Sequence, residues 1–245
     1  MVPAAGRGTR LGADLPKILV PVARGHRVWH LLHESLSTVA DHVHVVLSPD
    51  GETLFRDLAM SEIASGLVST GVQPIPIGMG DAVFRDAESW SADDDILVVW
   101  GDQVNLRATT LVRTVEAHRD GTGPRLTMPV VRPAAPYVEY VFHDSSLVAV
   151  KQSREGDSCR PGGISDVGAF LLTAEGLKEA WQTYLDRIRD DELGQLTGEV
   201  NFLPFLAYLS RDLGWAVTTV EAVDQVEARG VNTPEDLEFA RRSLI

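Results

Sequence analysis

Residues 4–17 read AAGRGTRLGADLPK and combine three glycines with two arginines and a lysine. They stand in an acidic chain, which has 22 Lys and Arg residues against 35 Asp and Glu residues and a formal net charge of −13. A glycine-rich turn between a strand and a helix exposes backbone N–H groups that can hold phosphate oxygens. The local reversal of charge therefore predicts a specific anionic ligand near the N-terminus.

The composition predicts one globular domain over residues 1–245. Hydrophobic residues make up 44% of the chain and charged residues 23%, so a sizeable core can form. The negative charge disfavours non-specific binding to nucleic acid or to an anionic membrane. No apolar run approaches the roughly 20 residues that span a bilayer, and there is no hydrophobic signal-peptide core. We therefore expect a cytoplasmic protein with neither nucleic acid nor membrane as a partner. Cys159 is the only cysteine, which excludes an internal disulfide, and we interpret it as a loop residue.

The first half of the chain alternates strands with helices. VHVVL (43–47) and ILVVW (96–100) are short β-branched runs typical of buried strands, and residues 28–40 and 106–120 have apolar residues at helical spacing. This alternation predicts a Rossmann-like three-layer α/β/α sandwich with a mostly parallel central sheet. Only Met1, Val2 and Pro3 precede the glycine loop, so either the first strand is very short or a few residues precede this start.

The second half has a different texture. LTMPVV (126–131), YVEYVF (137–142) and SLVAVKQ (146–152) resemble successive strands, and we expect a small mixed β insert over about 125–170. Helices are predicted near 174–190 and 200–211, with a strand at 215–222 between them and the last helix. Thr233 and Pro234 are typical of the start of a terminal helix.

Four further blocks follow the loop in order. They are Gln73 with IGMGDA (77–82), VWGD (99–102), SDVG (165–168) and GVNT (230–233). Together with AAGRGTRLGADLPKILVPV (4–22), they resemble the nucleoside-triphosphate transferases that make nucleotide sugars, the sugar-1-phosphate nucleotidyltransferases. The pattern is most similar to the uridylyltransferase domain that acts on N-acetylglucosamine 1-phosphate. The resemblance extends over nearly the whole chain.

The resemblance implies a nucleotide site at the loop and at two later turns. The loop residues implied to bind nucleotide are Pro3, Ala4, Ala5, Gly6, Arg7, Gly8, Thr9 and Arg10, and the later ones are Gln73, Gly78, Met79 and Gly101. The amide of Gln73 has a donor and an acceptor, so it can pair with the edge of a pyrimidine. Two alternatives stay open: Gln73 as a surface amide, and Gly78 with Gly80 as an ordinary loop.

The implied catalytic residues are Arg10, Lys17 and Asp102. Lys17 would hold the acceptor or the α-phosphate, and Arg10 would hold the β- and γ-phosphates. Asp102 ends a predicted strand and would bind Mg²⁺ together with Asn232, since carboxylate and amide oxygens suit this ion. Alternatively, Asp102 caps a turn and Asn232 begins the cap of the last helix.

The residues on the acceptor side depart from the family pattern. Lys151 stands where the family has a glutamate, Asp166 replaces an asparagine, Met79 replaces a threonine and Tyr137 replaces a glycine. The candidate acceptor-binding residues are Tyr137, Lys151, Asp166, Gly168 and Glu199, although Glu199 could instead cap a helix.

The resemblance implies an Mg²⁺-dependent nucleotidyltransferase. It would transfer NMP from an NTP, with a pyrimidine base expected, to a sugar 1-phosphate and release pyrophosphate. The altered acceptor side also allows a cytidylyltransferase for a non-sugar phosphate or phosphonate, and a more distant alternative is a non-catalytic nucleotide-binding module. The expected partners are an NTP and a phosphorylated small-molecule acceptor, and a homodimer is a candidate assembly.

Overall fold

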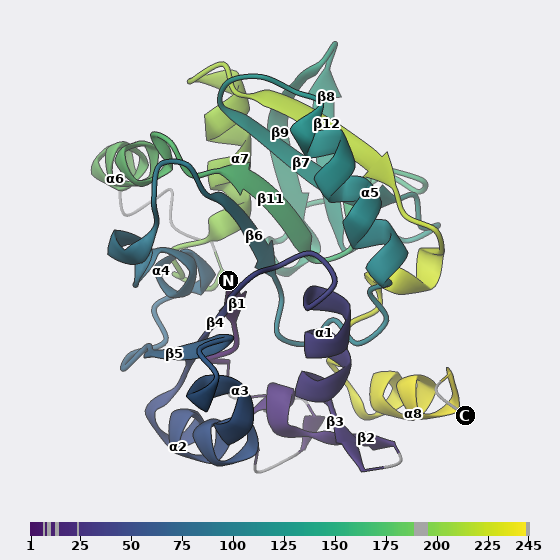
Figure 1. Ribbon diagram of the computed structural model, residues 1–245. Coiled ribbons are helices and arrows are strands. Elements are labelled where there is room, and N and C mark those ends of the chain that lie inside the picture. The colour runs from purple at the N-terminus through teal and green to yellow at the C-terminus, as the bar shows by residue number, and fades with distance from the viewer. Residues whose placement is uncertain (7, 9–10, 13–14, 24, 189–195, 244–245) are drawn as a thin grey trace.

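A computed structural model describes the chain except for residues 7, 9–10, 13–14, 24, 189–195 and 244–245. Its N-terminal half contains a parallel sheet in the order β5–β4–β1 (Figure 1). These strands span Val68–Val72, Val43–Leu47 and Val2–Pro3. The first strand is therefore short, and residue 4 already belongs to the glycine loop.

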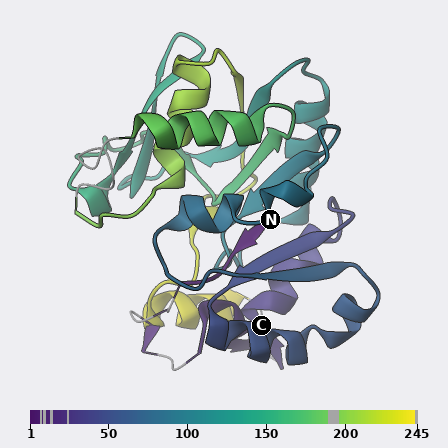
Figure 2. The same ribbon diagram turned by 90° about the vertical axis from the view of Figure 1, so that its left-hand side faces the viewer.

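The short strand β1 joins this sheet to a second one. The Met1 amino group donates to the Leu97 carbonyl at 2.8 Å, and the Val99 N–H donates to the Met1 carbonyl at 3.0 Å. Met1 thus forms hydrogen bonds with Leu97 and Val99, the two residues that flank its neighbour in the adjacent strand. This is the pattern of parallel strands, so β1 runs parallel to β6 (Asp95–Val99). In Figure 2 the N-terminal strand lies between the purple-to-blue half and the teal-to-green half.

Beyond β6 the sheet is mixed. β11 (Ala169–Thr173) is antiparallel to β6 and to β7 (Arg125–Val131), and β12 (Ala216–Glu221) is parallel to β7. The short strand β10 (Ser165–Asp166) pairs with the end of β7. The combined order is β5–β4–β1–β6–β11–β7–β12, and the carboxyl ends of β6 and β7 lie at the same edge.

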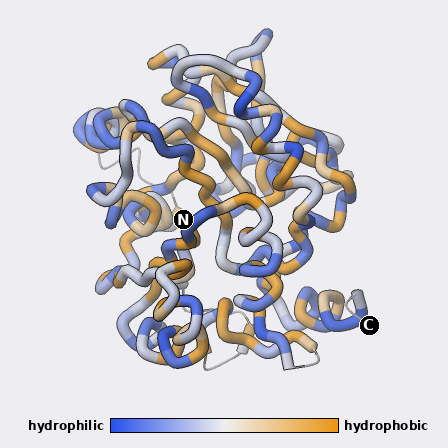
Figure 3. The backbone as a smooth tube through the Cα atoms, viewed as in Figure 1, coloured by the Kyte–Doolittle hydropathy of each residue, from blue (hydrophilic) through white to orange (hydrophobic). Residues whose placement is uncertain are grey.

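Helices cover both faces of the sheet. One face carries α1 (Val28–Leu36), α2 (Pro49–Leu58), α3 (Met60–Ala64) and α5 (Ala108–Arg119), and the other carries α4 (Met79–Phe84), α6 (Leu177–Arg187) and α7 (Phe202–Arg211). Adjacent strand residues alternate between the two cores: Val98 packs with α7, and Val99 packs with α1. Figure 3 shows the hydrophobic residues gathered along the central strands. The predicted three-layer α/β fold is confirmed.

The expected elements are present, with shifted ends. The strand at 43–47 matches β4, the strand at 96–100 begins one residue earlier, and the helix at 28–40 ends at Leu36. The terminal helix α8 (Pro234–Ser243) begins as expected, because the Asp236 N–H donates to the Thr233 hydroxyl at 3.2 Å. No described helix is both long and apolar enough to cross a membrane.

The expected insert over about 125–170 is too wide. β7, β10 and β11 belong to the central sheet, and only the hairpin of β8 (Val138–His143) and β9 (Ser146–Gln152) forms a separate antiparallel pair, packed against α7. Because β7 pairs on both edges and is covered on each face, all residues of its run LTMPVV are buried. That pattern indicates a central strand.

Candidate active site

The glycine loop begins between the carboxyl ends of β4 and β6. The Ala4 N–H donates to the Val46 carbonyl at 2.7 Å, and the Gly101 N–H donates to the Pro3 carbonyl at 3.4 Å. A Cβ on Gly101 would lie 2.9 Å from the Ala4 Cβ, so glycine is needed for this close approach. Ligands of open α/β sheets collect at this edge.

Lys17 joins the loop to two distant segments. Its Nζ donates to Asp102 Oδ2 at 3.0 Å and to Asn232 Oδ1 at 2.6 Å. Lys17 opens the 3₁₀ turn η2 (Lys17–Leu19), Asp102 follows β6, and Asn232 precedes α8. The side chains of Lys17 and Asp102 are 22% and 16% exposed, so a ligand can reach this pair. The structure therefore brings together three of the predicted site residues.

The segment before α8, residues 230–232, packs against Asp102. The Val231 N–H donates to the Asp102 carbonyl at 2.9 Å, and a Cβ on Gly230 would lie 2.9 Å from Asp102 Oδ1. Asp236 accepts the Asn232 N–H at 3.1 Å and the Arg229 Nε–H at 2.8 Å. Burial alone would raise the pKa of Asp236, but these hydrogen bonds lower it overall. An ionised Asp236 thus holds Asn232 toward Lys17.

Both capping alternatives at this site are excluded by the contacts. The helix cap is Thr233, and the Asn232 side chain is bonded to Lys17. The only described hydrogen-bond partner of the Asp102 carboxylate is the same ammonium. Because Asp102 and Asn232 each present an oxygen to one ammonium group, the same two oxygens could bind a metal cation. One carboxylate and one amide oxygen suit Mg²⁺, which takes few protein oxygens and keeps phosphate and water ligands. The described residues contain no group of three or more His, Cys, Asp or Glu side chains arranged for a metal.

Asp166 lies beside this site and is partly buried. Its Oδ2 accepts the Tyr140 hydroxyl at 2.9 Å, and its Oδ1 accepts the Gly168 N–H at 2.6 Å. Burial raises the pKa of Asp166 above its usual value; the two hydrogen bonds oppose the rise, and the charge of Asp102 adds to it. Gly168 has φ of 76°, and its carbonyl accepts the Trp100 N–H at 2.9 Å.

Gln73 is buried and contacts the turn at Gly78. Its Nε2 donates to the Gly78 carbonyl at 2.9 Å and to Asp81 Oδ2 at 2.8 Å, so the surface-amide alternative is wrong. These two acceptors fix the amide orientation, which leaves Oε1 without a described partner. A Cβ on Gly78, at φ of 135°, would lie 2.4 Å from the Val200 carbonyl, so glycine permits this turn to pack on residue 200.

Comparisons with known proteins identify the family of this chain. A family model described as the MobA-like NTP transferase domain matches residues 1–162. The chain belongs to this family. Nucleotidyl transfer is therefore its class of activity.

Several solved structures have a similar fold. A Bacillus anthracis protein assigned as a glucose-1-phosphate thymidylyltransferase, solved with sucrose, has a TM-score of 0.75 at 14% identity, covering 99% of this chain and 93% of that one. A 4-diphosphocytidyl-2C-methyl-D-erythritol synthase from Anaerococcus prevotii has 0.66 at 14%, with 99% and 93% covered. HddC from Yersinia pseudotuberculosis has 0.66 at 16%, with 100% and 98% covered.

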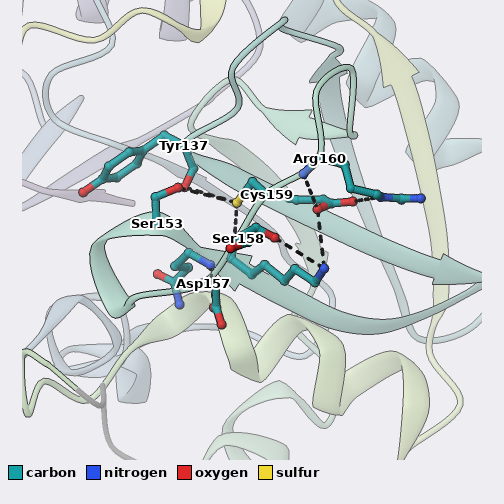
Figure 4. A network of polar contacts seen from close by, with 9 residues as sticks. Tyr137, Ser153, Asp157, Ser158, Cys159 and Arg160 are labelled. Atoms are coloured by element: carbon teal, nitrogen blue, oxygen red, sulfur yellow. Dashed lines mark hydrogen bonds and ion pairs between the residues drawn. The ribbon is translucent and has the colours of Figure 1, made fainter.

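The predicted acceptor residues of this NTP transferase fall into three places. Asp166 and Gly168 lie next to the end of β6, as described above. Lys151 lies in a separate cluster, 3.8 Å from the buried Glu139 and 3.5 Å from the Ser158 carbonyl. Tyr137 borders that cluster and is largely exposed, and Figure 4 shows it beside Cys159 and Ser153.

Glu199 forms the third place. It pairs with Arg154 at 2.9 Å, and the N-cap of α7 is Asn201, so the capping alternative for Glu199 is wrong.

Three predicted nucleotide residues, Arg7, Thr9 and Arg10, lie outside the described residues. Tyr140 and Asp236 are not among the site residues predicted from the sequence. The Thr233–x–x–Asp236 spacing of a capping box could have indicated Asp236. Nothing local marks Tyr140, because its partner Asp166 is on another strand.

Proposed function

We propose that this enzyme transfers the nucleotidyl group of a pyrimidine NTP to a phosphorylated small molecule and releases pyrophosphate. The observation that carries this proposal is the convergence of Lys17, Asp102 and Asn232 at the sheet edge where the glycine loop ends. A sugar 1-phosphate is the first acceptor class to test, because the ordered sequence blocks resemble enzymes for that class.

Positioning and charge stabilisation carry the proposed catalysis. An oxygen of the acceptor phosphate attacks the α-phosphorus in line; the new P–O bond forms while the bond to the pyrophosphate oxygen breaks. No covalent enzyme intermediate is required. Asp102 and Asn232 would hold Mg²⁺, which supplies positive charge next to the α-phosphate and the departing pyrophosphate.

Lys17 has two positions in this proposal. In the structure its ammonium lies on Asp102 and Asn232, where it neutralises the carboxylate. Two cations cannot share the same two oxygens at contact distance, because their repulsion is large at low dielectric. If these oxygens hold Mg²⁺ during the reaction, Lys17 would turn to the phosphates and would stabilise the charge that develops during transfer.

Gln73 offers a hydrogen-bond acceptor that a pyrimidine base can use. Its donor is occupied by Gly78 and Asp81, which leaves Oε1 as an acceptor. An acceptor at that position pairs with N3–H of uracil or thymine, or with the amino group of cytosine.

A non-sugar phosphate or phosphonate is the second candidate acceptor. Both carboxylate oxygens of Asp166 are already engaged by Tyr140 and Gly168, which leaves less capacity for a sugar hydroxyl. Lys151 is a cation at the sequence position where the resembling enzymes have a glutamate.

Pyrophosphate release tests the proposal. ATP, GTP, CTP, UTP and dTTP are each combined with sugar 1-phosphates, phospho-alcohols and phosphonates in the presence of Mg²⁺. We expect release only when a pyrimidine NTP, an acceptor and the metal are all present, and release slower by about a hundredfold or more from the Asp102→Asn variant. Equal or faster release with ATP or GTP would exclude the base assignment. Nucleotide binding without release from any pair would indicate a non-catalytic nucleotide-binding module.

A further inference from the structure

A cavity lies apart from Lys17. It has a volume of about 320 Å³ and is lined by Arg132, Tyr140, Phe142, Arg160, Pro161, Gly162, Gly163 and Ile164. Three segments form it: the residue after β7, one face of β8, and the loop before β10. The two aromatic rings contribute an apolar part, and the two arginines contribute positive charge in a chain of net charge −13.

The cavity lies on the ligand-binding edge of the sheet. β6 and β7 are both antiparallel to β11, so Arg132 follows the carboxyl end of β7 at the edge where Asp102 follows β6. Tyr140 lines the cavity, and its hydroxyl donates a hydrogen bond to Asp166. The negative charge of Asp102 contributes to the raised pKa of Asp166, so these two carboxyl groups are close. The two sites are therefore neighbours along one edge.

Arg160 is held in place by a buried carboxylate. Glu139 accepts the Arg160 backbone N–H at 2.9 Å and its Nε–H at 2.5 Å, and the Glu139 side chain is fully buried. Burial alone would raise the pKa of Glu139, but the hydrogen bonds and charge of Arg160 lower it overall. In Figure 4 the Arg160 side chain extends away from Cys159 and Tyr137.

The terminal nitrogens of both arginines are uncommitted among the described residues. Arg160 binds Glu139 only through its backbone N–H and Nε, and its side chain is 71% exposed. Arg132 has one partner, Glu221, whose carboxylate lies 3.4 Å from Nε and whose side chain is 60% exposed. An exposed ion pair of this kind contributes little and competes weakly with a ligand. Guanidinium forks match the geometry of phosphate and carboxylate oxygens.

We propose that Arg132 and Arg160 bind the phosphate or carboxylate group of a small molecule in this cavity, at a position separate from Lys17, Asp102 and Asn232. The anion has two candidate sources. It is either a second anionic group of the acceptor or a free anion that binds beside the reaction site.

Titration with inorganic phosphate at constant ionic strength tests the site without turnover, so it is independent of the proposed reaction. We expect saturable ¹H–¹⁵N shifts at the amides of Arg160, Gly162 and Gly163. In Arg132→Gln the affinity read from those amides should fall about tenfold or more, because a charge-assisted pair is lost. Arg113→Gln on α5 is the matched control, since it removes an exposed arginine elsewhere and should leave the affinity unchanged. Arg160→Lys is the second variant, because it keeps a cation beside the buried Glu139 while losing the fork.

Acceptor kinetics distinguish the two sources. If the acceptor supplies the anion, phosphate competes with the acceptor, and Arg132→Gln raises the acceptor KM about tenfold at nearly constant kcat. If the anion is free, phosphate binds without competing and the KM is unchanged. The proposal is overturned if phosphate does not shift these amides, or if Arg132→Gln and Arg113→Gln have the same affinity as the native protein.

Discussion

The ammonium of Lys17 lies 2.6 Å from the side-chain oxygen of Asn232, although 215 residues separate them in the chain. The same ammonium donates to Asp102 at 3.0 Å, so the Asp102 and Asn232 oxygens can be no further apart than the sum of these two distances. Separation beyond about 8 Å would have excluded direct sharing of one Mg²⁺, given Mg–O distances near 2.1 Å. A lysine thus occupies a place that a metal can take.

Lys17→Met should increase the affinity for a divalent cation in the absence of nucleotide. The variant removes the competing ammonium and leaves the oxygens of Asp102 and Asn232 free, whereas transfer should fall by about two orders of magnitude or more. Mn²⁺ binding followed by electron paramagnetic resonance measures the first effect without activity. Lys178→Met, which removes a lysine paired with the exposed Glu88, is the control. Weaker Mn²⁺ binding in Lys17→Met than in the control would contradict the exchange.

Asp102→Asn should abolish most transfer while leaving the fold intact. Loss of the carboxylate removes the only formal negative charge among the two proposed metal-binding side chains, and we expect kcat/KM to fall about 10²- to 10³-fold. Circular dichroism checks the fold, and titration of Mg²⁺ in the assay checks the cause. EDTA should stop the native enzyme. Native-like rates in the variant would remove Asp102 from the mechanism.

Asp166→Asn should have a stability advantage that grows with pH. The folded-state pKa of Asp166 is raised, chiefly by burial, so its contribution to stability is fully present below the unfolded-state pKa of about 3.9 and is lost as pH rises through the folded-state value. An amide keeps a similar shape and pays no ionisation cost, and the Tyr140 hydroxyl can turn to accept from it.

Urea unfolding from pH 4 to pH 8 measures this effect. The free energy of unfolding of Asp166→Asn minus that of the native protein should increase with pH over this range. The exposed Asp41→Asn variant gives the reference slope. A difference that is constant or falls with pH would show that Asp166 is not destabilised by ionisation.

Gly168→Ala should destabilise the protein more than Gly123→Ala. Both glycines have positive φ, 76° and 72°, so each substitution costs about 1–2 kcal/mol in backbone conformation. A Cβ at Gly168 would also lie 2.6 Å from Gln103 Nε2 and 2.8 Å from Trp100 Cδ1, whereas Gly123 has open space. Overpacking adds about 1–3 kcal/mol at Gly168 alone. Equal unfolding free energies for the two variants would show that the neighbours move without cost.

Several elements follow from local sequence. VHVVL and ILVVW are short β-branched runs that form β4 and β6 because adjacent side chains must enter two cores. Thr233 and Pro234 begin α8 because a hydroxyl accepts a free N–H and proline needs no donor in the first turn. The order of the glycine loop, Asp102 and Asn232 indicated one nucleotide site through the family resemblance.

Contacts between distant segments were decided by the tertiary structure. Local pattern placed β7 in an insert, but its pairing with β11 and β12 places it inside the sheet. Lys151 and Glu199 were grouped with Asp166, yet each is engaged in a different ion pair. The sequence by itself determined where strands and helices begin and which polar residues follow them, because short-range backbone preferences and burial periodicity act locally. Only the strand order and register decided that Lys17 meets Asn232 and that Tyr140 meets Asp166, because such contacts depend on how segments far apart in the chain are packed together.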